Sequence, residues 1–502
     1  MRDQGIGSWP ARRARMTPDR VALVQDGVPT TYAELADRAG RFAQTLRERG
    51  VARGERVAFL GRNSVEFVIT MFAAAQLGAV FVPLNTRLAG PETAAILADC
   101  SPRLLVRDLG LEAPGPEELV FEAAAGRGLD QVLTRDGAAP DEAVGLDDLF
   151  MIQYTSGTGG RPKGVRLSHG NIVWNVFNLL VDVDVGSDEV ALVTAPLFHT
   201  AALNQVLLPT LLKGGKALVE AQFDAGRTLA LIEQHGVTLL FGVTSMYQAL
   251  ARDERWASAD LSTLRSALSG GAPIPESLLR TWLERGLAIL QGYGLTEASP
   301  GATMLRAADG LRKLGSAGTS CFFSDVRVVT PDRRPVPAGE PGEVLVQGPN
   351  VTSGYWNQPQ LTAQTLSEDG WLHSGDLAVV DQEGYLHIVG RLKDMYISGG
   401  ENVYPAEVEE AIYTHPAVAE CAVIGVPDQT WGEVGRAVIV LHTGRTLSTD
   451  ELLAHLQGRL ARYKHPRSVV FTDHLPHNAS GKLVKSRVLE LHGLTDRTES
   501  AE

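Results

Sequence analysis

The pattern of apolar and polar residues alternates between helical and extended periods along the first part of the chain. Apolar positions recur at helical spacing between Thr31 and Gly50, which predicts an amphipathic helix capped by Thr31 and ended by Gly50. The apolar run at residues 56–60 predicts a short buried strand, and a second helix and strand follow at residues 67–78 and 79–83. Similar apolar tracts recur further along, and the alternation predicts parallel α/β layers.

The pattern changes later in the chain. Residues 110–145 are rich in Ala, Gly, Pro and acidic residues, which predicts a surface connection with some structure of its own. After Ser320, extended patterns at residues 325–329 and 342–346 flank a turn-rich segment and predict a small β subdomain.

A domain boundary is expected where residues 390–394 read Gly-Arg-Leu-Lys-Asp. Beyond it, helical patterns at residues 405–415 and 450–460 flank strand patterns at residues 419–426 and 436–441, which predicts a separate α+β domain.

The expected fold class is therefore α/β, with a large N-terminal domain of layered α/β subdomains, a small β subdomain within it, and a small mobile α+β C-terminal domain. The expected bounds are residues 1–390 for the N-terminal domain, 391–394 for a hinge and 395–502 for the C-terminal domain.

Charge and composition narrow the class of protein. The 502 residues carry a net charge of −13, and no basic stripe of the kind that binds nucleic acid is present. Three cysteines lie far apart without a paired spacing, which argues against a disulfide framework or a zinc site. No apolar run approaches the ~18 residues that span a bilayer, and no apolar signal core is seen near the start. We expect a cytoplasmic enzyme without an integral membrane segment.

The strongest chemical motif is a loop of glycines and hydroxyls. Residues 154–164 read Tyr-Thr-Ser-Gly-Thr-Gly-Gly-Arg-Pro-Lys-Gly. Glycines let backbone N–H groups turn toward an anion, hydroxyls add donors and the lysine adds positive charge, so the loop suits the phosphates of a nucleotide. It is not a Walker A loop, because the Gly-Lys-Ser/Thr ending is absent. The alternative is a flexible glycine-rich surface loop.

Six further motifs follow in order. They read Pro-Leu-Phe-His at 196–199, Ser-Gly-Gly-Ala-Pro at 269–273, Gly-Tyr-Gly-Leu-Thr-Glu at 292–297, Trp-Leu-His-Ser-Gly-Asp at 371–376, Tyr-Ile-Ser-Gly-Gly-Glu-Asn at 396–402, and Asn-Ala-Ser-Gly-Lys at 478–482. Taken singly, each has an ordinary structural alternative: a turn, a core histidine or a solvated lysine.

Taken together, over nearly the whole chain, these motifs resemble the adenylate-forming superfamily of acyl-CoA synthetases, luciferases and peptide-synthetase adenylation domains. Among its members the chain looks closest to bacterial fatty-acyl-CoA and hydroxycinnamoyl-CoA ligases. The resemblance implies ATP-dependent, AMP-forming activation of a medium- or long-chain fatty acid or an aryl acid, followed by transfer to CoA. The implied cofactors are ATP, Mg²⁺ and CoA, and the implied partners are a small carboxylic acid and CoA or a carrier protein, with no nucleic acid.

The resemblance also implies roles for the nucleotide site. Phosphate contacts are expected from the first loop, at Thr155, Ser156, Gly157, Thr158 and Lys163. The base pocket is expected from Gly271, Ala272 and Pro273, with Tyr293 stacked on adenine. Asp376 and Arg391 are expected to hold the ribose, Thr296 to contact the α-phosphate and Glu297 to bind Mg²⁺.

Four implied roles belong to the reaction steps. Lys482 is expected to reach the reacting carboxylate and α-phosphate, where a cation lowers the barrier, and His199 to gate or orient the acid. Lys393 is expected at the hinge, and Gly399 and Gly400 at the passage for the pantetheine arm. Rotation of the C-terminal domain would present Lys482 first and the glycine loop second.

The chain departs from the family pattern at Gly159, Tyr396 and His465, where a hydroxyl residue and two aliphatic residues are usual. The last two positions bear on the thiol step. Two alternatives therefore stay open: adenylation with a different acid or acceptor, such as a carrier protein or nitrite activated toward an aryl amine, and a non-catalytic nucleotide-binding protein.

The identity of the acid is not fixed by the motifs. The expected pocket walls at residues 199–204, 243–247 and 298–301 are mostly small and apolar, which suits a long chain or a flat ring. They contain no Lys or Arg, so a dicarboxylic acid is disfavoured.

Overall fold

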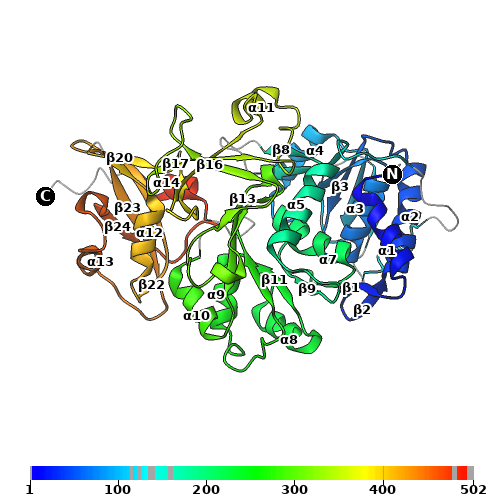
Figure 1. Cartoon of the computed structure of the whole chain (residues 1–502), viewed down its shortest axis with the longest axis horizontal. Helices are drawn as coiled ribbons and strands as arrows, with labels where there is room; N and C mark the ends of the chain where they lie inside the picture. Colours follow the sequence, from blue (N-terminus) through cyan, green and yellow to red (C-terminus); the bar gives the residue numbers. More distant parts are fainter. Residues whose placement is uncertain are drawn as a thin grey trace.

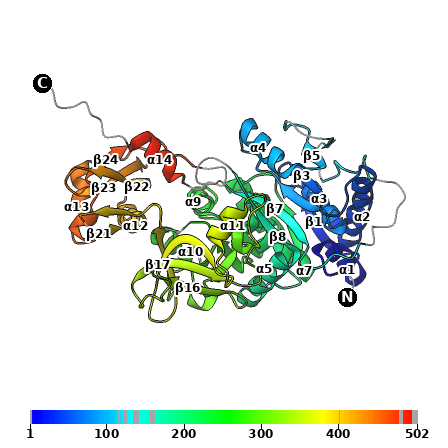
Figure 2. The same cartoon turned by 90° about the horizontal axis from the view of Figure 1, so that it is seen from above.

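A computed structural model describes residues 3–113, 117–121, 126–133, 142–155, 162–272, 274–399, 401–477 and 483–493. Four β-sheets organise the chain. In Figures 1 and 2 the N-terminus and the orange-to-red C-terminal sheet lie at opposite ends of the molecule, with the green segments between them. The mixed α/β class expected from the sequence is confirmed.

The first sheet has six strands in the order β6-β5-β3-β4-β7-β8. Its strands are β3 (Arg56–Leu60), β4 (Val80–Pro83), β5 (Leu104–Asp108), β6 (Glu118–Phe121), β7 (Leu149–Thr155) and β8 (Lys163–Ser168). Neighbours run parallel except for β7 and β8, which pair antiparallel. The strand predicted at residues 56–60 is confirmed, and β6 lies within the expected connection at 110–145.

Two capped helices pack against each other, and the second of them also packs on β3 and β4. Helix α2 (Tyr32–Glu48) begins after Thr31, whose hydroxyl accepts from the backbone N–H of Glu34, and Gly50 follows its end with a φ of 80°. Helix α3 (Val65–Gln76) begins two residues before the predicted start, because Ser64 caps it by accepting from the N–H of Phe67 at 3.2 Å. Almost all of α3 is buried, which hides its start from an amphipathic pattern.

The second sheet has nine strands in the order β15-β14-β13-β12-β11-β9-β10-β1-β2. Its strands are β1 (Val21–Gln25), β2 (Val28–Thr31), β9 (Val190–Val193), β10 (Lys216–Val219), β11 (Leu239–Gly242), β12 (Ser266–Ser269), β13 (Ile289–Gly294), β14 (Gly301–Met304) and β15 (Thr319–Ser320). The six strands from β13 to β1 in this order run parallel, and antiparallel strands close both edges. Chemical motifs therefore follow the carboxyl ends of β12 and β13, where parallel sheets place ligand sites.

Helices cover both sheets of the N-terminal part. They are α1 (Trp9–Met16), α4 (Gly90–Cys100), α5 (His169–Asp182), α6 (Thr200–Ala202), α7 (Leu208–Lys213), α8 (Ala225–His235), α9 (Thr244–Arg252), α10 (Glu276–Glu284) and α11 (Pro359–Thr365). None of the described helices combines the length and apolarity needed to cross a bilayer.

The third sheet is the small β subdomain predicted from residues 325–346. It is fully antiparallel, in the order β16-β17-β18-β19, with β16 (Asp325–Val329), β17 (Pro341–Gln347), β18 (Leu372–Val380) and β19 (Leu386–Arg391). The last residue of β19, Arg391, pairs in register with Asp376 of β18.

The fourth sheet lies beyond residue 395. It contains β20 (Tyr396–Ser398), β21 (Glu401–Val403), β22 (Val418–Asp428), β23 (Gly432–Leu441) and β24 (Ser468–Phe471), covered by α12 (Pro405–Tyr413), α13 (Thr449–Leu456) and α14 (Lys485–His492). The predicted α+β character is confirmed. Helix α13 ends four residues early, because Gly458 adopts a φ of 74° in the following turn.

Tyr396, which departs from the family pattern, is a core residue. Its side chain is 2% exposed and packs in a slot between Gly425 and Gly435, where a Cβ atom would lie 2.5 Å and 2.3 Å from the tyrosine. Those two glycines make room for the ring. The side chain is therefore directed into the C-terminal core.

His169 links the start of the chain to α5. Its Nδ1 accepts from the backbone N–H of Ile6 at 3.1 Å, so the ring must be neutral, and burial lowers its pKa from 6.5 to about 4. The unfolded chain binds this proton more readily. The contribution to stability is therefore complete above pH 6.5 and is lost as the pH falls toward 4.

We expect His169→Gln to flatten the pH dependence of unfolding. Between about pH 7.5 and 5 the native protein should lose roughly 2 kcal/mol through this group, so the variant's stability deficit should shrink by that amount. Urea unfolding at several pH values, followed by tryptophan fluorescence, measures the difference. A constant deficit across the range would show that His169 does not titrate in this way.

Candidate active site

Three predicted residues meet at one carboxylate. Asp376 is 6% exposed, and the Nε of Arg391 lies 2.8 Å from its Oδ1. The hydroxyl of Tyr293, at the end of β13, donates to the other oxygen, Oδ2, at 2.8 Å. Burial, followed by the negative charge of Asp376, raises the pKa of Tyr293 well above its usual value, so the phenol stays protonated and can donate.

The base side of this cluster follows β12. Gly271 has a φ of 92°, and Ala272 follows it in a bend, while Pro273 lies outside the described residues. A Cβ atom at Gly270 would lie 3.1 Å from the carbonyl oxygen of Gly292, so only a glycine lets this loop approach β13 closely. A Cβ atom at Gly271 would meet no described atom within 4 Å, so the space beside this glycine is open, which suits a planar base.

The phosphate loop is framed by two described residues. Thr155 ends β7, Lys163 begins β8, and the two are register partners across the hairpin. Ser156, Gly157, Thr158 and the variant Gly159 lie between them, outside the described residues. The hairpin therefore fixes where the loop begins and ends.

The predicted metal ligand lies beside this hairpin. Glu297 occupies η3 (Thr296–Ala298), directly after the Tyr293 motif, and half-buried Thr296 begins the same turn. The Oε1 atom of Glu297 accepts from the hydroxyl of Tyr355 at 2.8 Å, and the backbone carbonyl of Glu297 accepts from the N–H of Thr352 at 2.7 Å. Sequence reasoning missed Tyr355, because the run Gly-Tyr-Trp at 354–356 gives no hint of its partner.

The donor set around Glu297 fits Mg²⁺ bound through a nucleotide. Among the described residues no cluster of three His, Cys, Asp or Glu could hold a metal alone. A single carboxylate suits Mg²⁺ when phosphate oxygens and water supply its other ligands.

The acid side of the site is apolar and neutral. His199 precedes α6, and its Nε2 has no hydrogen-bond partner among the described residues. Burial, aided by the positive charge of Arg87, lowers the pKa of His199 to about 4, so the imidazole is uncharged at neutral pH. A short π-helix, η2 (Leu203–Leu207), continues directly from α6. Such extra-residue turns are frequent at functional sites.

Two of the three expected pocket walls touch. The side-chain amide of Asn204 donates to the carbonyl of Ser299 at 2.9 Å, which joins the segments 199–204 and 298–301. In the third segment, Tyr247 is fully buried against Trp282, and its hydroxyl donates to the carbonyl of Leu268 at 2.8 Å. The end of that segment therefore belongs to the core rather than to a pocket.

The hinge residues leave the nucleotide cluster directly. The N–H of Leu392 donates to the carbonyl of Gly375 at 2.9 Å, and exposed Lys393 follows in a turn. Gly399 lies between β20 and β21 with a φ of 63°, and a Cβ atom there would lie 2.6 Å from the ring of Trp431. Gly400 and Lys482 lie outside the described residues.

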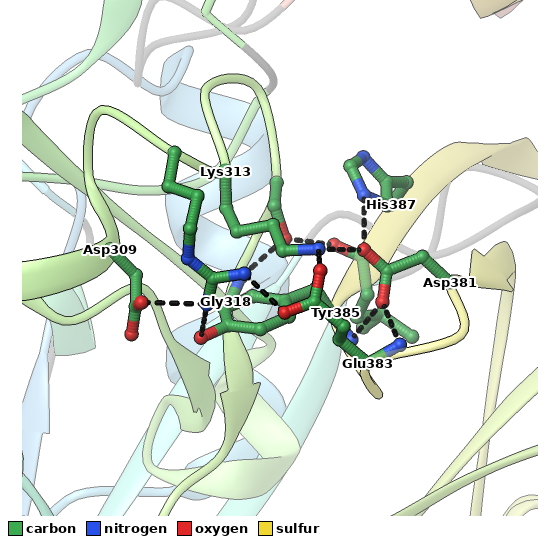
Figure 3. A network of polar contacts seen from close by, with 10 residues as sticks. Asp309, Lys313, Gly318, Asp381, Glu383, Tyr385 and His387 are labelled. Carbon is green, nitrogen blue, oxygen red and sulfur yellow. Dashed lines mark hydrogen bonds and ion pairs between the residues drawn. The ribbon is translucent and has the colours of Figure 1, made fainter.

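A charged network holds the turn between β18 and β19 (Figure 3). The Nζ of Lys313 lies 2.6 Å from both Asp381 and Glu383, and 4.6 Å from the ring centre of Tyr385. Burial opposes ionisation of Asp381, but hydrogen bonds from Lys313 and backbone N–H groups outweigh it and lower its pKa to about 2. The network fastens the hairpin that carries Asp376 and Arg391 to residues 309–313.

Comparison with protein families settles the class of this site. Residues 10–356 match the AMP-binding enzyme family, and residues 407–482 match the AMP-binding enzyme C-terminal domain. The chain belongs to the AMP-binding enzyme family. The predicted membership of the adenylate-forming superfamily is thereby confirmed.

Relatives within the AMP-binding enzymes span the whole chain. Feruloyl-CoA synthases from Amycolatopsis sp and Streptomyces sp are 54% identical over 98% of this chain and 100% of theirs. Indoleacetate–CoA ligase of Aromatoleum aromaticum is 42% identical, covering 97% of this chain and 98% of its own. The structure of o-succinylbenzoate CoA synthetase from Bacillus subtilis, in complex with its acyl-adenylate OSB-AMP, superposes with a TM-score of 0.88 at 33% identity, covering 96% of this chain and 97% of that one.

These relatives confirm the predicted reaction class. The chain is an AMP-forming acid–CoA ligase: it uses ATP and Mg²⁺ to make an acyl-adenylate and then a CoA thioester. Transfer to CoA therefore stands despite the departures at Tyr396 and His465, and the alternative of a non-catalytic nucleotide binder is not supported.

We expect Lys313→Met to weaken nucleotide binding, although Lys313 is not among the residues proposed to contact the nucleotide. Releasing the turn at 381–385 should lower the melting temperature by a few degrees and raise KM for ATP roughly threefold, the scale of a partly exposed ion-pair network. Lys313→Arg should recover most of both losses. Steady-state kinetics and thermal unfolding measure them, and an unchanged KM with a lowered melting temperature would show that the hairpin keeps its position without the network.

Proposed function

We propose that the preferred acid is an aryl-propenoic acid of the hydroxycinnamic type, with ferulic acid as the first candidate. The observation that carries this proposal is the 54% identity to feruloyl-CoA synthases over nearly the full length of both chains. The neutral, mostly apolar pocket walls support a flat aromatic acid with a single carboxylate. A medium- or long-chain fatty acid is the second candidate.

The proposed nucleotide site includes residues that the structure describes and others that lie outside the described ranges. Lys163 and the loop residues Thr155, Ser156, Gly157 and Thr158 hold the phosphates, and Glu297 holds Mg²⁺. Gly271, Ala272, Pro273 and Tyr293 form the base pocket, and Asp376 and Arg391 hold the ribose. The contacts of Asp376 with Tyr293 and Arg391 support this assignment, because they orient one carboxylate at the carboxyl ends of the central strands.

Attack of the acid on the α-phosphate builds up negative charge, which the site has to stabilise. Mg²⁺, when bound, spreads the negative charge of the phosphates. Lys482 and Thr296 stabilise the charge that develops as the acid attacks, and Lys163 neutralises the departing pyrophosphate. Neutral His199 can hydrogen-bond the carboxylate of the acid without holding it as an ion pair, so the carboxylate keeps its nucleophilicity.

The two half-reactions use two faces of the C-terminal domain. We place the N-terminal domain at residues 1–390, the hinge at 391–394 and the mobile domain at 395–502. The hydrophobic clusters support this division, since the cores containing Tyr396 and Val488 draw only on residues beyond the hinge. Rotation at Lys393 exchanges Lys482 for the passage at Gly399 and Gly400.

Cytoplasmic localisation is part of the proposal. Cys100, Cys321 and Cys421 are all buried and unpaired, as expected of a protein that works in a reducing compartment.

A substrate panel tests the choice of acid. Pyrophosphate release with ATP and Mg²⁺ should be greatest with ferulic acid, lower with benzoic and fatty acids, and negligible with malonate, because the predicted wall segments themselves contain no Lys or Arg to pair with a second carboxylate. With CoA present, mass spectrometry should identify feruloyl-CoA. Preference for a fatty acid would move the assignment to the second candidate, and robust turnover of malonate would contradict the pocket analysis. Product formed only with a carrier protein, or only from nitrite and an aryl amine, would favour another acceptor.

A single substitution tests the role of Lys482. Lys482→Ala should lower the rate of adenylate formation by roughly 100-fold or more, because a preorganised charge at the transition state is lost. Thioester formation from supplied feruloyl-adenylate and CoA should be largely retained, since the second step uses the other face of the domain. Equal loss in both steps would argue against the division of roles.

A further inference from the structure

Tyr355 contacts two opposite charges that the proposed function assigns to MgATP. Its hydroxyl donates to Oε1 of Glu297 at 2.8 Å, and the Nζ of Lys163 lies 5.9 Å from the centre of its ring. The described residues form no ion pair between Lys163 and Glu297, and each of the two charged side chains contacts Tyr355 instead.

The backbone around Tyr355 fixes the ring in this position. Tyr355 forms a β-bridge with Val165 of β8, and the N–H of Trp356 donates to the carbonyl of Gly164 at 2.7 Å. The N–H of Tyr355 donates to the hydroxyl of Thr362 in α11 at 2.9 Å. The ring is 6% exposed, so it cannot swing into solvent.

The phenol is the donor in this contact, because a carboxylate oxygen can only accept. The hydroxyl therefore fixes one oxygen of the Glu297 carboxylate. Because the carboxylate is already oriented, less conformational entropy is lost when it binds a cation.

We propose that Tyr355 is a positioning residue, which orients Glu297 for Mg²⁺ and keeps Lys163 from pairing with Glu297 so that the lysine remains available to a phosphate. This inference rests on the proposed roles of Glu297 and Lys163. Without the ring, the two charges would collapse into an ion pair that MgATP would have to break. The hydroxyl and the ring therefore serve separate purposes.

The groove beside Tyr355 shows what removal of the ring would do. A groove of about 390 Å³ lies along Tyr355, lined also by Arg166, Gln358, Thr362 and Leu366. Replacement of the ring by a small side chain would open this groove toward Glu297 and admit water. Phenylalanine keeps the ring and removes only the hydroxyl, so it isolates the hydrogen bond.

Binding of ATP, measured by calorimetry with and without Mg²⁺, tests both purposes. Tyr355→Phe should raise the Mg²⁺ concentration for half-maximal effect roughly tenfold, the loss expected for a hydrogen bond to a charged acceptor, and leave Mg²⁺-free ATP binding unchanged. Tyr355→Leu should weaken Mg²⁺-free ATP binding as well, because Lys163 then pairs with Glu297. Tyr32→Phe is a matched control: its buried hydroxyl donates to the carbonyl of Gly215 at 2.7 Å, away from the site.

Glu297→Gln separates failure of this inference from failure of the assigned metal site. If Glu297→Gln raises the Mg²⁺ requirement but Tyr355→Phe behaves like Tyr32→Phe, the positioning role is wrong and the metal site stands. If Glu297→Gln leaves the Mg²⁺ requirement unchanged, the metal assignment is wrong and the Tyr355 inference falls with it. Thermal unfolding of each variant confirms that its fold is intact, and a Tyr355→Leu effect confined to Mg²⁺ would overturn the charge-separating role of the ring.

Discussion

Burial of the Asp376 carboxylate is the constraint on which the site depends. A carboxylate that is 6% exposed is costly unless donors surround it. Its two donors come from different elements, since Tyr293 ends a strand of the central sheet and Arg391 ends the last strand before the hinge. Satisfying one charge therefore brings two sheets together, and the proposed hinge begins at the same contact.

The periodic and chemical signals in the sequence were strong enough to predict much of this. The strand at 56–60 and the cap at Thr31 depend on local patterns, and the structure has both. The sequence motifs also singled out Asp376, Arg391 and Tyr293, which the structure joins at hydrogen-bond distance. The motifs of a known family could single these residues out, because the chemistry proposed for them restricts the residue types that can serve.

What the sequence could not predict depends on contacts between distant segments. Tyr355 contacts Glu297 across 58 positions, and no local pattern indicates such a pair. The slot for Tyr396 exists because Gly425 and Gly435 lack side chains, so an unusual residue that looked disruptive is accommodated by its neighbours. The start of α3 was misplaced because a helix buried on nearly every side has no polar face to mark its phase.

The π-helix Leu203–Leu207 gives the proposed acid pocket a backbone feature that the identity of its side chains does not describe. A π turn holds one more residue than an α turn, so this stretch of backbone is locally wider than a regular helix. Deleting one residue here would let the segment return to α geometry and would remove that widening. The shape of this wall is thus set by backbone length as well as by the choice of side chains.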